Sequence, residues 1–340
     1  MNRIVPILLP LVLTAATARP GAAAPPGEPV RPIRPVATYS IVARDAATGQ
    51  LGVAVQSHWF SVGGVVPWAE AGVGAVATQS MVDPLYGPAG LELMRLGRSA
   101  PAALAGLLAS DNASALRQVA MIDAAGHVAA HTGARCIAAA GMVVDEKNQF
   151  SVQANLMENE RVWPAMAAAY VACHGDLVER MLAALDAAES AGGDIRGRQS
   201  AALLVVAGKP SGKAWADRLF DLRVEDHPTP LVELRRLVQL QRAYSHMNAG
   251  DEAIEKKDFA RAGVEYAAAE KLAPQVVEMP FWQAVSLANN GHVDEALPIF
   301  RDVFAREPQR WVPLIPRLVQ SELLPKDPQV AKKILAEAPK

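Results

Sequence analysis

The chain has 340 residues, of which 51% are hydrophobic and 5% aromatic, and its formal net charge at pH 7 is −2. This length exceeds one average domain and predicts two compact units. The small net charge argues against a nucleic-acid-binding protein, because phosphate contacts need a clustered excess of Lys and Arg.

Residues 1–24 have the pattern of a secretory signal peptide. Arg3 provides a positive start, an apolar core follows over residues 4–12, and small-residue cleavage sites end at Ala18 and Ala24. An uncleaved membrane anchor is the alternative, but the apolar run is much shorter than the roughly 20 residues that span a bilayer. We therefore expect a periplasmic or secreted protein with no membrane span once the signal is removed.

Residues 25–37 are rich in proline and predict an extended linker. Beyond it, alternating segments at 38–45 and 51–57 predict a first β-hairpin. Further strands are expected at 65–80, 116–123, 127–132, 150–155, 200–206 and 219–224, and helices at 93–96, 100–108, 165–172 and 177–191. This order predicts an α+β domain over residues 38–230, with antiparallel sheets and helices packed outside them.

Residues 231–340 show apolar residues at helical spacing and predict an all-α region. Two sets of residues recur 34 positions apart, namely Ala262, Tyr266 and Pro274, then Ala296, Phe300 and Pro308. The spacing is similar to that of tetratricopeptide repeats, in which Ala permits close helix pairs, the aromatic residue fills the gap and Pro ends the second helix. Helices at 231–247 and 313–338 would act as caps. The alternative is an ordinary helical extension packed on the first domain.

No sequence motif for a metal ion or an organic cofactor is present. The chain has no CxxC pair, no HExxH helix and no Asp-rich calcium loop, and its seven His residues are scattered. We therefore expect no cofactor. The separation of Cys136 and Cys173 leaves open whether they form a disulfide or remain two free thiols.

Five sequence blocks occur in the order of a known family: TYSIVARDAATGQLGVAVQSHWFSVGGVVPWAEAGVGAVATQS, YGPAGLELM, HTGARC, FSVQANLM and GGDIRGRQSAALLVV. They resemble the bacterial family called domain of unknown function 1028, which is grouped with the N-terminal-nucleophile hydrolases. The resemblance covers about residues 38–240. It implies a four-layer αββα sandwich, with two antiparallel sheets between helical layers, followed by the tetratricopeptide-like region.

The resemblance also implies an activity. In that superfamily a Thr, Ser or Cys becomes N-terminal by processing, and its own α-amine, with a pKa of about 8, acts as the general base. Thr38 occupies that position here. The implied function is hydrolysis of an amide or peptide-like C–N bond. It requires cleavage after Ala37, which lies beyond the expected signal-peptidase sites, and without that cleavage Thr38 is an ordinary strand residue.

Other polar residues near strand ends complete the expected catalytic set. His58 lies where proteasome subunits keep a Lys, and it could supply positive charge or act as a base. Asn155 could donate to an oxyanion, and Asp194 could orient the amine or the nucleophile. Alternatively, His58 faces solvent and the loop that carries Asp194 only satisfies its own backbone.

Residues that could bind the substrate lie at strand ends and in the GGDIRGRQS loop. Arg198 could hold a substrate carboxylate with its planar guanidinium. Ser200 could complete the hydrogen-bond network, and the pairs Thr78–Gln79 and His131–Thr132 lie at strand ends that could line the same opening. The expected substrate-binding residues are Ser57, Thr78, His131, Arg198 and Ser200.

A second function class is consistent with the same residues. The first domain could be an inactive hydrolase fold that binds a ligand in the cell envelope, with the helical repeats contacting a partner protein. The N-terminal residue of the mature chain separates the two hypotheses. A third hypothesis places catalysis on His58 or the Asp194 loop without an N-terminal amine. Assembly into a homo-oligomer through the helical repeats is compatible with each of them.

Overall fold

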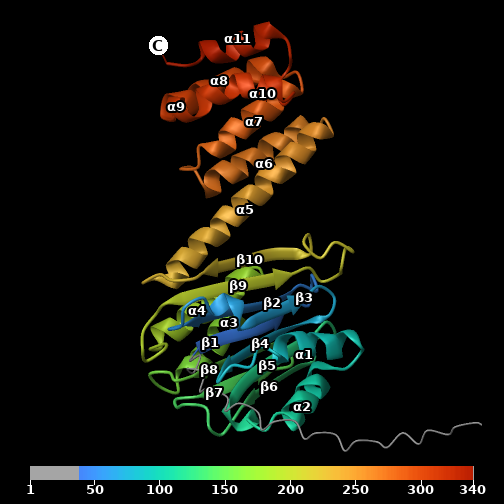
Figure 1. The fold of residues 1–340 in the computed structure, drawn as a ribbon, viewed down its shortest axis with the longest axis vertical. Coiled ribbons are helices and arrows are strands. Elements are labelled where there is room, and N and C mark those ends of the chain that lie inside the picture. The colour runs from blue at the N-terminus through green and yellow to red at the C-terminus, as the bar shows by residue number, and fades with distance from the viewer. Residues whose placement is uncertain (1–37, 340) are drawn as a thin grey trace, which may run out of the picture. The chain divides into compact units, whose positions relative to one another are not determined.

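The computed structural model describes residues 38–339, so the expected signal peptide and linker lie outside the described residues. Within this part of the chain, ten strands form two antiparallel sheets, and a helical region follows them (Figure 1). The predicted α+β class, with antiparallel sheets and a C-terminal helical region, is confirmed. None of the helices within residues 38–339 is long and apolar enough to cross a membrane.

The larger sheet has six strands in the order β10-β9-β2-β1-β8-β7. They are β1 (Thr38–Arg44), β2 (Leu51–Ser57), β7 (Gly141–Asp145), β8 (Phe150–Asn155), β9 (Ser200–Val206) and β10 (Arg218–Val224). The hairpin of β1 and β2 places Thr38 opposite Ser57, and β8 places Asn155 opposite Thr38 on the other side. Strand β1 therefore lies inside the sheet with a partner on each side. The edge strand β7 is absent from the sequence prediction, since its five residues are half-exposed and show no clear apolar face.

The smaller sheet has four strands in the order β3-β4-β5-β6. They are β3 (Pro67–Glu70), β4 (Gly74–Ser80), β5 (Arg117–Asp123) and β6 (Val128–Thr132). The segment 65–80, expected as strand throughout, contains two strands and a turn. Gly72 makes the turn with φ of 71°, a conformation that side chains with a Cβ rarely adopt.

The alternation of side chains along each strand creates the layers. On β1, Tyr39 and Ile41 pack against α3 (Val162–Ala172) and α4 (Leu177–Ser190), whereas Val42 packs against the smaller sheet. The outer face of the smaller sheet is covered by α1 (Tyr86–Arg95) and α2 (Ala100–Ser110) (Figure 1). The two sheets thus lie face to face between two pairs of helices.

Helix α1 begins seven residues before the expected helix at 93–96. The sequence does not predict its first turns, because Gly and Pro disfavour helix interiors and this segment contains Gly87, Pro88 and Gly90. Packing explains the glycines: a Cβ on Gly87 would lie 2.3 Å from the Trp68 ring, and one on Gly90 would lie 2.8 Å from Met121 Cε. The close contact between helix and sheet outweighs the weak helix propensity.

The helical region begins inside the core of the first domain. Its helices are α5 (Pro230–Glu255), α6 (Phe259–Leu272), α7 (Glu278–Asn289), α8 (Val293–Arg306), α9 (Pro308–Trp311), α10 (Ile315–Gln320) and α11 (Pro328–Ala336). Leu234 and Val238 of α5 belong to the same cluster as α3 and α4, while Ala243 and Met247 belong to the cluster of the later helices. Helix α5 exceeds the expected span of 231–247, because it continues through Gly250, which packs against the Tyr266 ring.

Two of the three residues that recur in this region, the Ala and the aromatic residue, are buried in both repeats. Ala262 and Tyr266 lie in α6, and Ala296 and Phe300 lie in α8. Gly250 of α5 allows the Tyr266 ring to approach, since a Cβ there would lie 2.5 Å from Tyr266 Cε1. A hydrogen bond from the Tyr266 hydroxyl to Asp251 Oδ1, at 2.7 Å, holds the ring in this position next to Gly250.

Two glycines of this region make a matched test of that contact. Gly250→Ala should lower the free energy of unfolding by about 1–2 kcal/mol through overpacking. Gly263→Ala, in α6 where an added Cβ meets no atom within 4 Å, should raise it by about 0.5–1 kcal/mol because Ala is the better helix former. Urea unfolding of the full chain, followed by circular dichroism, measures both. Equal effects of the two substitutions would contradict the close α5–α6 packing.

Candidate functional site

One end of the layer between the two sheets is polar. On the larger sheet, the pairing register aligns Ser200, Ser57, Thr38 and Asn155 in one row across β9, β2, β1 and β8. All four residues are fully buried. The next positions inward along the layer on β2 and β9 are apolar, with Val55 and Ala202. On β2 and β9 the polar residues are therefore confined to the strand ends, whereas Ser40 on β1 and Gln153 on β8 extend the polar region inward.

We refer to seven fully buried residues at this end as the polar cluster: Thr38, Ser40, Ser57, Gln79, Gln118, Gln153 and Asn155. Thr38 Oγ1 donates a hydrogen bond to Ser57 Oγ at 3.1 Å. From the smaller sheet, Gln79 Nε2 donates to the Thr38 carbonyl oxygen at 3.2 Å. Both the hydroxyl and the carbonyl group of Thr38 are thus held by side chains of neighbouring strands.

Gln118 joins the two sheets through its amide group. Its Oε1 accepts from Gln79 Nε2 at 2.7 Å and from Asn155 Nδ2 at 2.9 Å. Its Nε2 donates to Thr132 Oγ1 and to the Ala154 carbonyl oxygen, each at 2.9 Å. This amide orients both Gln79 and Asn155, which flank Thr38.

Ser40 and Gln153 form the inner part of the cluster. Ser40 Oγ donates to Gln79 Oε1 at 2.7 Å and accepts from Gln153 Nε2 at 2.5 Å. Gln79 therefore uses both its oxygen and its nitrogen, which fixes the orientation of its amide. A fixed amide next to Thr38 is a preorganised feature of the site.

Asn155 has one unused group. Its Nδ2 is bonded to Gln118, but its buried Oδ1 has no hydrogen-bond partner among residues 38–339. An unpaired acceptor in a buried position costs free energy, so this oxygen is suited to accept a hydrogen bond from a donor that arrives later. The arrangement differs from the predicted role of Asn155 as a donor to an oxyanion.

Asp194 and His58 lie together at the edge of the site. The backbone N–H of His58, next to Ser57, donates to Asp194 Oδ2 at 3.1 Å, and Arg196 Nη2 donates to the same oxygen at 2.9 Å. The backbone N–H of Arg196 occupies the second oxygen, Oδ1, at 2.9 Å. The hydrogen bonds of Asp194 thus hold the loop 194–198 against the end of β2. The half-buried His58 ring has no partner for Nδ1 within the described residues.

Ser200 is in the row with Thr38, but its hydroxyl serves a loop. It accepts from the backbone N–H of Val62 at 3.1 Å and donates to the Trp59 carbonyl oxygen. Both partners lie in the segment that follows β2. The Ser200 hydroxyl is therefore bonded to that segment as both acceptor and donor.

Arg198 was predicted to bind the substrate, and the structure does not bring it together with Thr38. Its guanidinium pairs with Glu189 of α4, and Glu189 Oε2 also accepts from the Tyr39 hydroxyl at 2.6 Å. Tyr39 belongs to the helix-facing side of β1, the opposite face from Thr38. Burial, together with the charge of Glu189, raises the pKa of Tyr39 well above its ordinary value.

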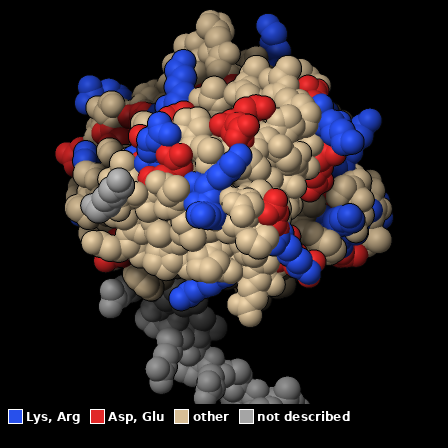
Figure 2. All heavy atoms as spheres, turned by 90° about the horizontal axis from the view of Figure 1, so that it is seen from above, with Lys and Arg blue, Asp and Glu red and all other residues tan. Residues whose placement is uncertain are grey.

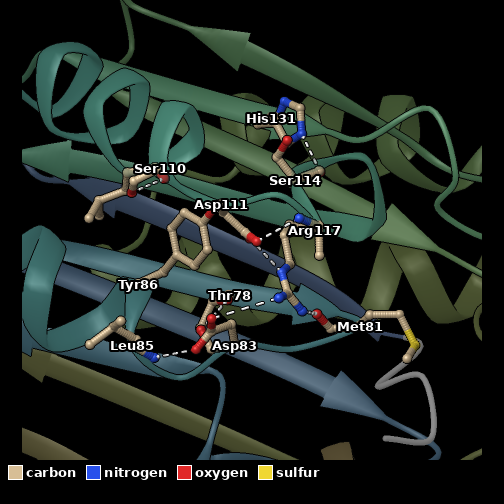
Figure 3. Close-up of polar contacts among 12 residues, drawn as sticks. Thr78, Met81, Asp83, Leu85, Tyr86, Ser110, Asp111, Ser114, Arg117 and His131 are labelled. Atoms are coloured by element: carbon tan, nitrogen blue, oxygen red, sulfur yellow. Dashed lines mark hydrogen bonds and ion pairs between the residues drawn. The ribbon is translucent and has the colours of Figure 1, made fainter. Parts of the chain in front are cut away.

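Thr78 and His131, the next two residues predicted to bind the substrate, lie on the face of the smaller sheet that is turned away from Thr38. Thr78 Oγ1 donates to the Asp83 carbonyl oxygen at 3.1 Å, and His131 Nε2 lies 2.9 Å from the Ser114 carbonyl oxygen. Figure 3 shows both side chains with these partners. The neighbouring residues Gln79 and Thr132 point between the sheets instead. Because side chains alternate along a strand, an error of one residue reverses the assigned face.

Arg117 organises the segment between β4 and α1, which lies at the same end of the smaller sheet (Figure 3). Its Nε donates to Asp111 Oδ2 at 2.7 Å, and its Nη1 donates to the Met81 carbonyl oxygen at 2.5 Å. The Tyr86 hydroxyl donates to the same Asp111 oxygen at 3.0 Å. Although partial burial acts to raise it, the pKa of Asp111 is lowered overall by these hydrogen bonds and by the charge of Arg117.

Three residues of the polar cluster were not predicted from the sequence: Ser40, Gln118 and Gln153. Two segments of the sequence contain a pattern that could have indicated Ser40 and Gln153. In TYSIVAR and FSVQAN, polar residues occupy every second position near the end of the strand that carries Thr38 or Asn155. The alternation alone indicates a solvent-facing side, so a second sheet over that side must be assumed before the residues are recognised as a cluster.

The described residues provide no cluster of metal ligands, and both of their cysteines are free thiols. Within residues 38–339, no three His, Cys, Asp or Glu side chains gather where they could share a metal ion. Cys136 and Cys173 are both free thiols. Cys136 Sγ lies 3.3 Å from the Arg117 carbonyl oxygen, and burial raises the pKa of its thiol.

Comparisons with known proteins point to one family. The sequence model of a family of unknown function, DUF1028, matches residues 38–234. A crystal structure from Silicibacter pomeroyi, described as a member of the same family, is 32% identical to this chain with a TM-score of 0.53. The match covers 60% of this chain and 85% of that one. No curated protein shows significant similarity to the sequence.

Because Gln118 bonds to several members of the polar cluster, we expect its replacement by an apolar residue to destabilise the fold strongly. Gln118→Leu leaves the Asn155 amide and the Ala154 carbonyl group buried without this partner, and it should lower the free energy of unfolding by about 2–4 kcal/mol. Thr132→Val removes a single acceptor and should cost about 1 kcal/mol. Urea unfolding measures both variants. A Gln118→Leu protein as stable as the parent would show that the network does not join the sheets.

Proposed function

The chain belongs to the DUF1028 family, and on that premise we propose that it is an exported hydrolase of the N-terminal-nucleophile type. Its substrate in this proposal carries an amide or peptide-like C–N bond. The fold in detail is then the four-layer αββα sandwich of that superfamily. Two antiparallel sheets that face each other between helix pairs support this assignment.

One observation carries the proposal: Thr38 is the first residue of an interior strand and lies in the polar row between the sheets. Its hydroxyl is 3.1 Å from Ser57 Oγ, and its carbonyl oxygen is held by Gln79. A nucleophile needs a fixed side chain with a proton acceptor in reach. The α-amine that would form at Thr38 is within reach of its own hydroxyl by covalent geometry.

The chemistry begins once the bond between Ala37 and Thr38 is cut. The neutral α-amine, with a pKa of about 8, takes the proton of the Thr38 hydroxyl as Oγ1 bonds to the substrate carbonyl carbon. The proton then passes to the substrate nitrogen as the C–N bond breaks, which leaves an ester on Thr38. A water molecule attacks that ester in the second step, and the acid is released as the hydroxyl is restored.

Asn155 takes a revised role in this proposal. Its Nδ2 is occupied by Gln118, whereas its Oδ1 is open and lies on the strand next to Thr38. Directly opposite residues on neighbouring strands have side chains within about 5.5 Å of each other. Asn155 Oδ1 is therefore suited to accept a hydrogen bond from the new α-amine and to hold it beside the hydroxyl.

The helical region is proposed to be of the tetratricopeptide type and to contact a partner protein. The buried residues Ala262, Tyr266, Ala296 and Phe300, which recur at the repeat spacing, support this assignment. On the face shown in Figure 2, Lys and Arg side chains are interspersed with Asp and Glu, and neither sign gathers in one area. Recognition through this face would depend on shape and local pairs rather than on net charge.

The proposal predicts that the chemistry depends on a free Thr38 amine. Two forms of the protein, one starting at Thr38 and one at Pro25, are treated with a β-lactone electrophile and analysed by intact mass and peptide mapping. Only the form starting at Thr38 should gain an acyl group, and the group should be on Thr38. Thr38→Ser should retain labelling, and Thr38→Ala should reduce amide hydrolysis by about 10³-fold or more.

N-terminal sequencing of the exported protein tests the processing step directly. A mature chain that starts at Thr38 supports the proposal. If the chain retains residues before Thr38 and His58→Ala abolishes its activity, catalysis belongs to His58 instead. If neither form is labelled and neither hydrolyses amides, the domain is a binding protein and the proposed activity is wrong.

A further inference from the structure

A pocket of about 240 Å³ lies on the helix-facing side of the larger sheet, opposite the side of Thr38. It is bounded by the end of α4, the segment before β9 and the first turn of α5. The residues that carry the argument are Gln56, Glu189, Arg198, Pro230, Leu231 and Val232. This volume is below the range of about 300–1,000 Å³ that is typical of pockets for drug-sized ligands. Any occupant must therefore be small.

Gln56 lies in β2 at this pocket, and its amide is unpaired. Its neighbours Val55 and Ser57 belong to the side that faces the other sheet, so the Gln56 side chain is on the helix-facing side. The residue is 0% exposed, and neither Oε1 nor Nε2 has a hydrogen-bond partner among residues 38–339. Gln79 and Gln118 are equally buried, yet both are bonded through oxygen and nitrogen.

An unpaired buried amide destabilises a fold, because the group has lost its hydrogen bonds to water without replacing them. Buried polar groups without a protein partner usually bond to ordered water, which a ligand with matching groups can displace. The position of Gln56 at a pocket, rather than in a sealed core, indicates where that molecule lies. The two unused atoms need one donor and one acceptor side by side.

The charged groups of the pocket are already compensated, since Asp186 pairs with Arg235 of α5 and Glu189 pairs with Arg198. The Glu189 carboxylate pairs with the Arg198 guanidinium and accepts from the Tyr39 hydroxyl at 2.6 Å. Because the pKa of Tyr39 is raised, that hydroxyl stays protonated as a donor. Pro230, Leu231 and Val232 of α5 add an apolar wall. The pocket thus combines one uncompensated amide with neutralised ion pairs and an apolar surface.

We propose that this pocket binds a small uncharged molecule that presents a C=O and an N–H on one edge, joined to an apolar segment. Lactams, primary amides and monosubstituted ureas have this arrangement, and each can form two parallel hydrogen bonds with the Gln56 amide. A carboxylate can only accept and would leave Gln56 Oε1 unpaired, while an ammonium can only donate. Such a group left unpaired in a buried site gives strong discrimination.

Entry to the pocket requires movement of its rim. The Arg198 side chain is 47% exposed and Val232 is 68% exposed, so both belong to the outer part of the pocket. Displacement of the long Arg198 side chain opens a path to Gln56 without a change in the sheet. The site is separate from the Thr38 site, because the sheet lies between them, and it does not depend on the hydrolase proposal.

Binding of δ-valerolactam to the full chain tests the proposal, with propionate and propylamine as charged probes. Saturation-transfer NMR and calorimetric titration should detect the lactam and neither charged probe. Gln56→Leu should weaken lactam binding at least tenfold, since it removes both hydrogen bonds while keeping a similar volume. Thr38→Ala should leave lactam binding unchanged, which separates this pocket from the proposed catalytic site.

Thermal unfolding supplies a second readout. Gln56→Leu should unfold at the same temperature as the parent or a higher one, because no protein hydrogen bond is lost, and the lactam should raise the unfolding temperature of the parent alone. Lactam binding that survives Gln56→Leu, or that disappears in Thr38→Ala, overturns the proposal.

If Gln56→Leu is strongly destabilised, a crystal of the parent protein soaked with the lactam decides the question. Density for the lactam bonded to Gln56 supports the proposal. Only ordered water at the Gln56 amide, with no lactam in the pocket, overturns it.

Discussion

The hydrogen bonds of the Gln118 amide are the interaction on which the site depends. Two sheets that face each other exclude water from the layer between them, so each polar group placed there needs a partner within the protein. Gln118 on the smaller sheet meets this need for Asn155 on the larger sheet and for Gln79 beside it. These bonds also fix the register, since a shift of β8 by one residue would turn Asn155 toward the helices.

The loops around Thr38 are held by a second group of polar residues at the same strand ends. Asp194 bonds to the backbone of His58, and Ser200 bonds to the segment 59–62. Ser80 at the end of β4 and Leu156 just beyond β8 have φ of 69° and 58°, and they turn the chain away from the sheets. Left-handed conformations at residues with a side chain persist where the surrounding structure holds them. The environment of Thr38 is therefore fixed by packing and hydrogen bonds on all the strands that end there.

The sequence predicts the strands well because their apolar residues alternate, and the order of strands and helices is sufficient for the α+β class. It fails for α1, whose glycines are explained only by contacts with Trp68 and Met121, and for the half-exposed edge strand β7. In the site, the sequence indicates Thr38, Ser57 and Asn155 as neighbours because all three end strands, and the register brings them together. The sequence does not show whether Thr78 or Gln79 lies next to Thr38, since this depends on which face of β4 meets the larger sheet.

The long helix α5 connects the family region to the rest of the chain. The family match ends at residue 234, yet Val238 still packs in the first core, and Ala243 begins the second core on the same helix. No loop separates the two cores, because the backbone between them is hydrogen-bonded helix. The first turn of this helix forms the apolar wall beside Gln56. A bend or rotation of α5 would therefore change that pocket before it could reach Thr38, which lies on the other face of the sheet.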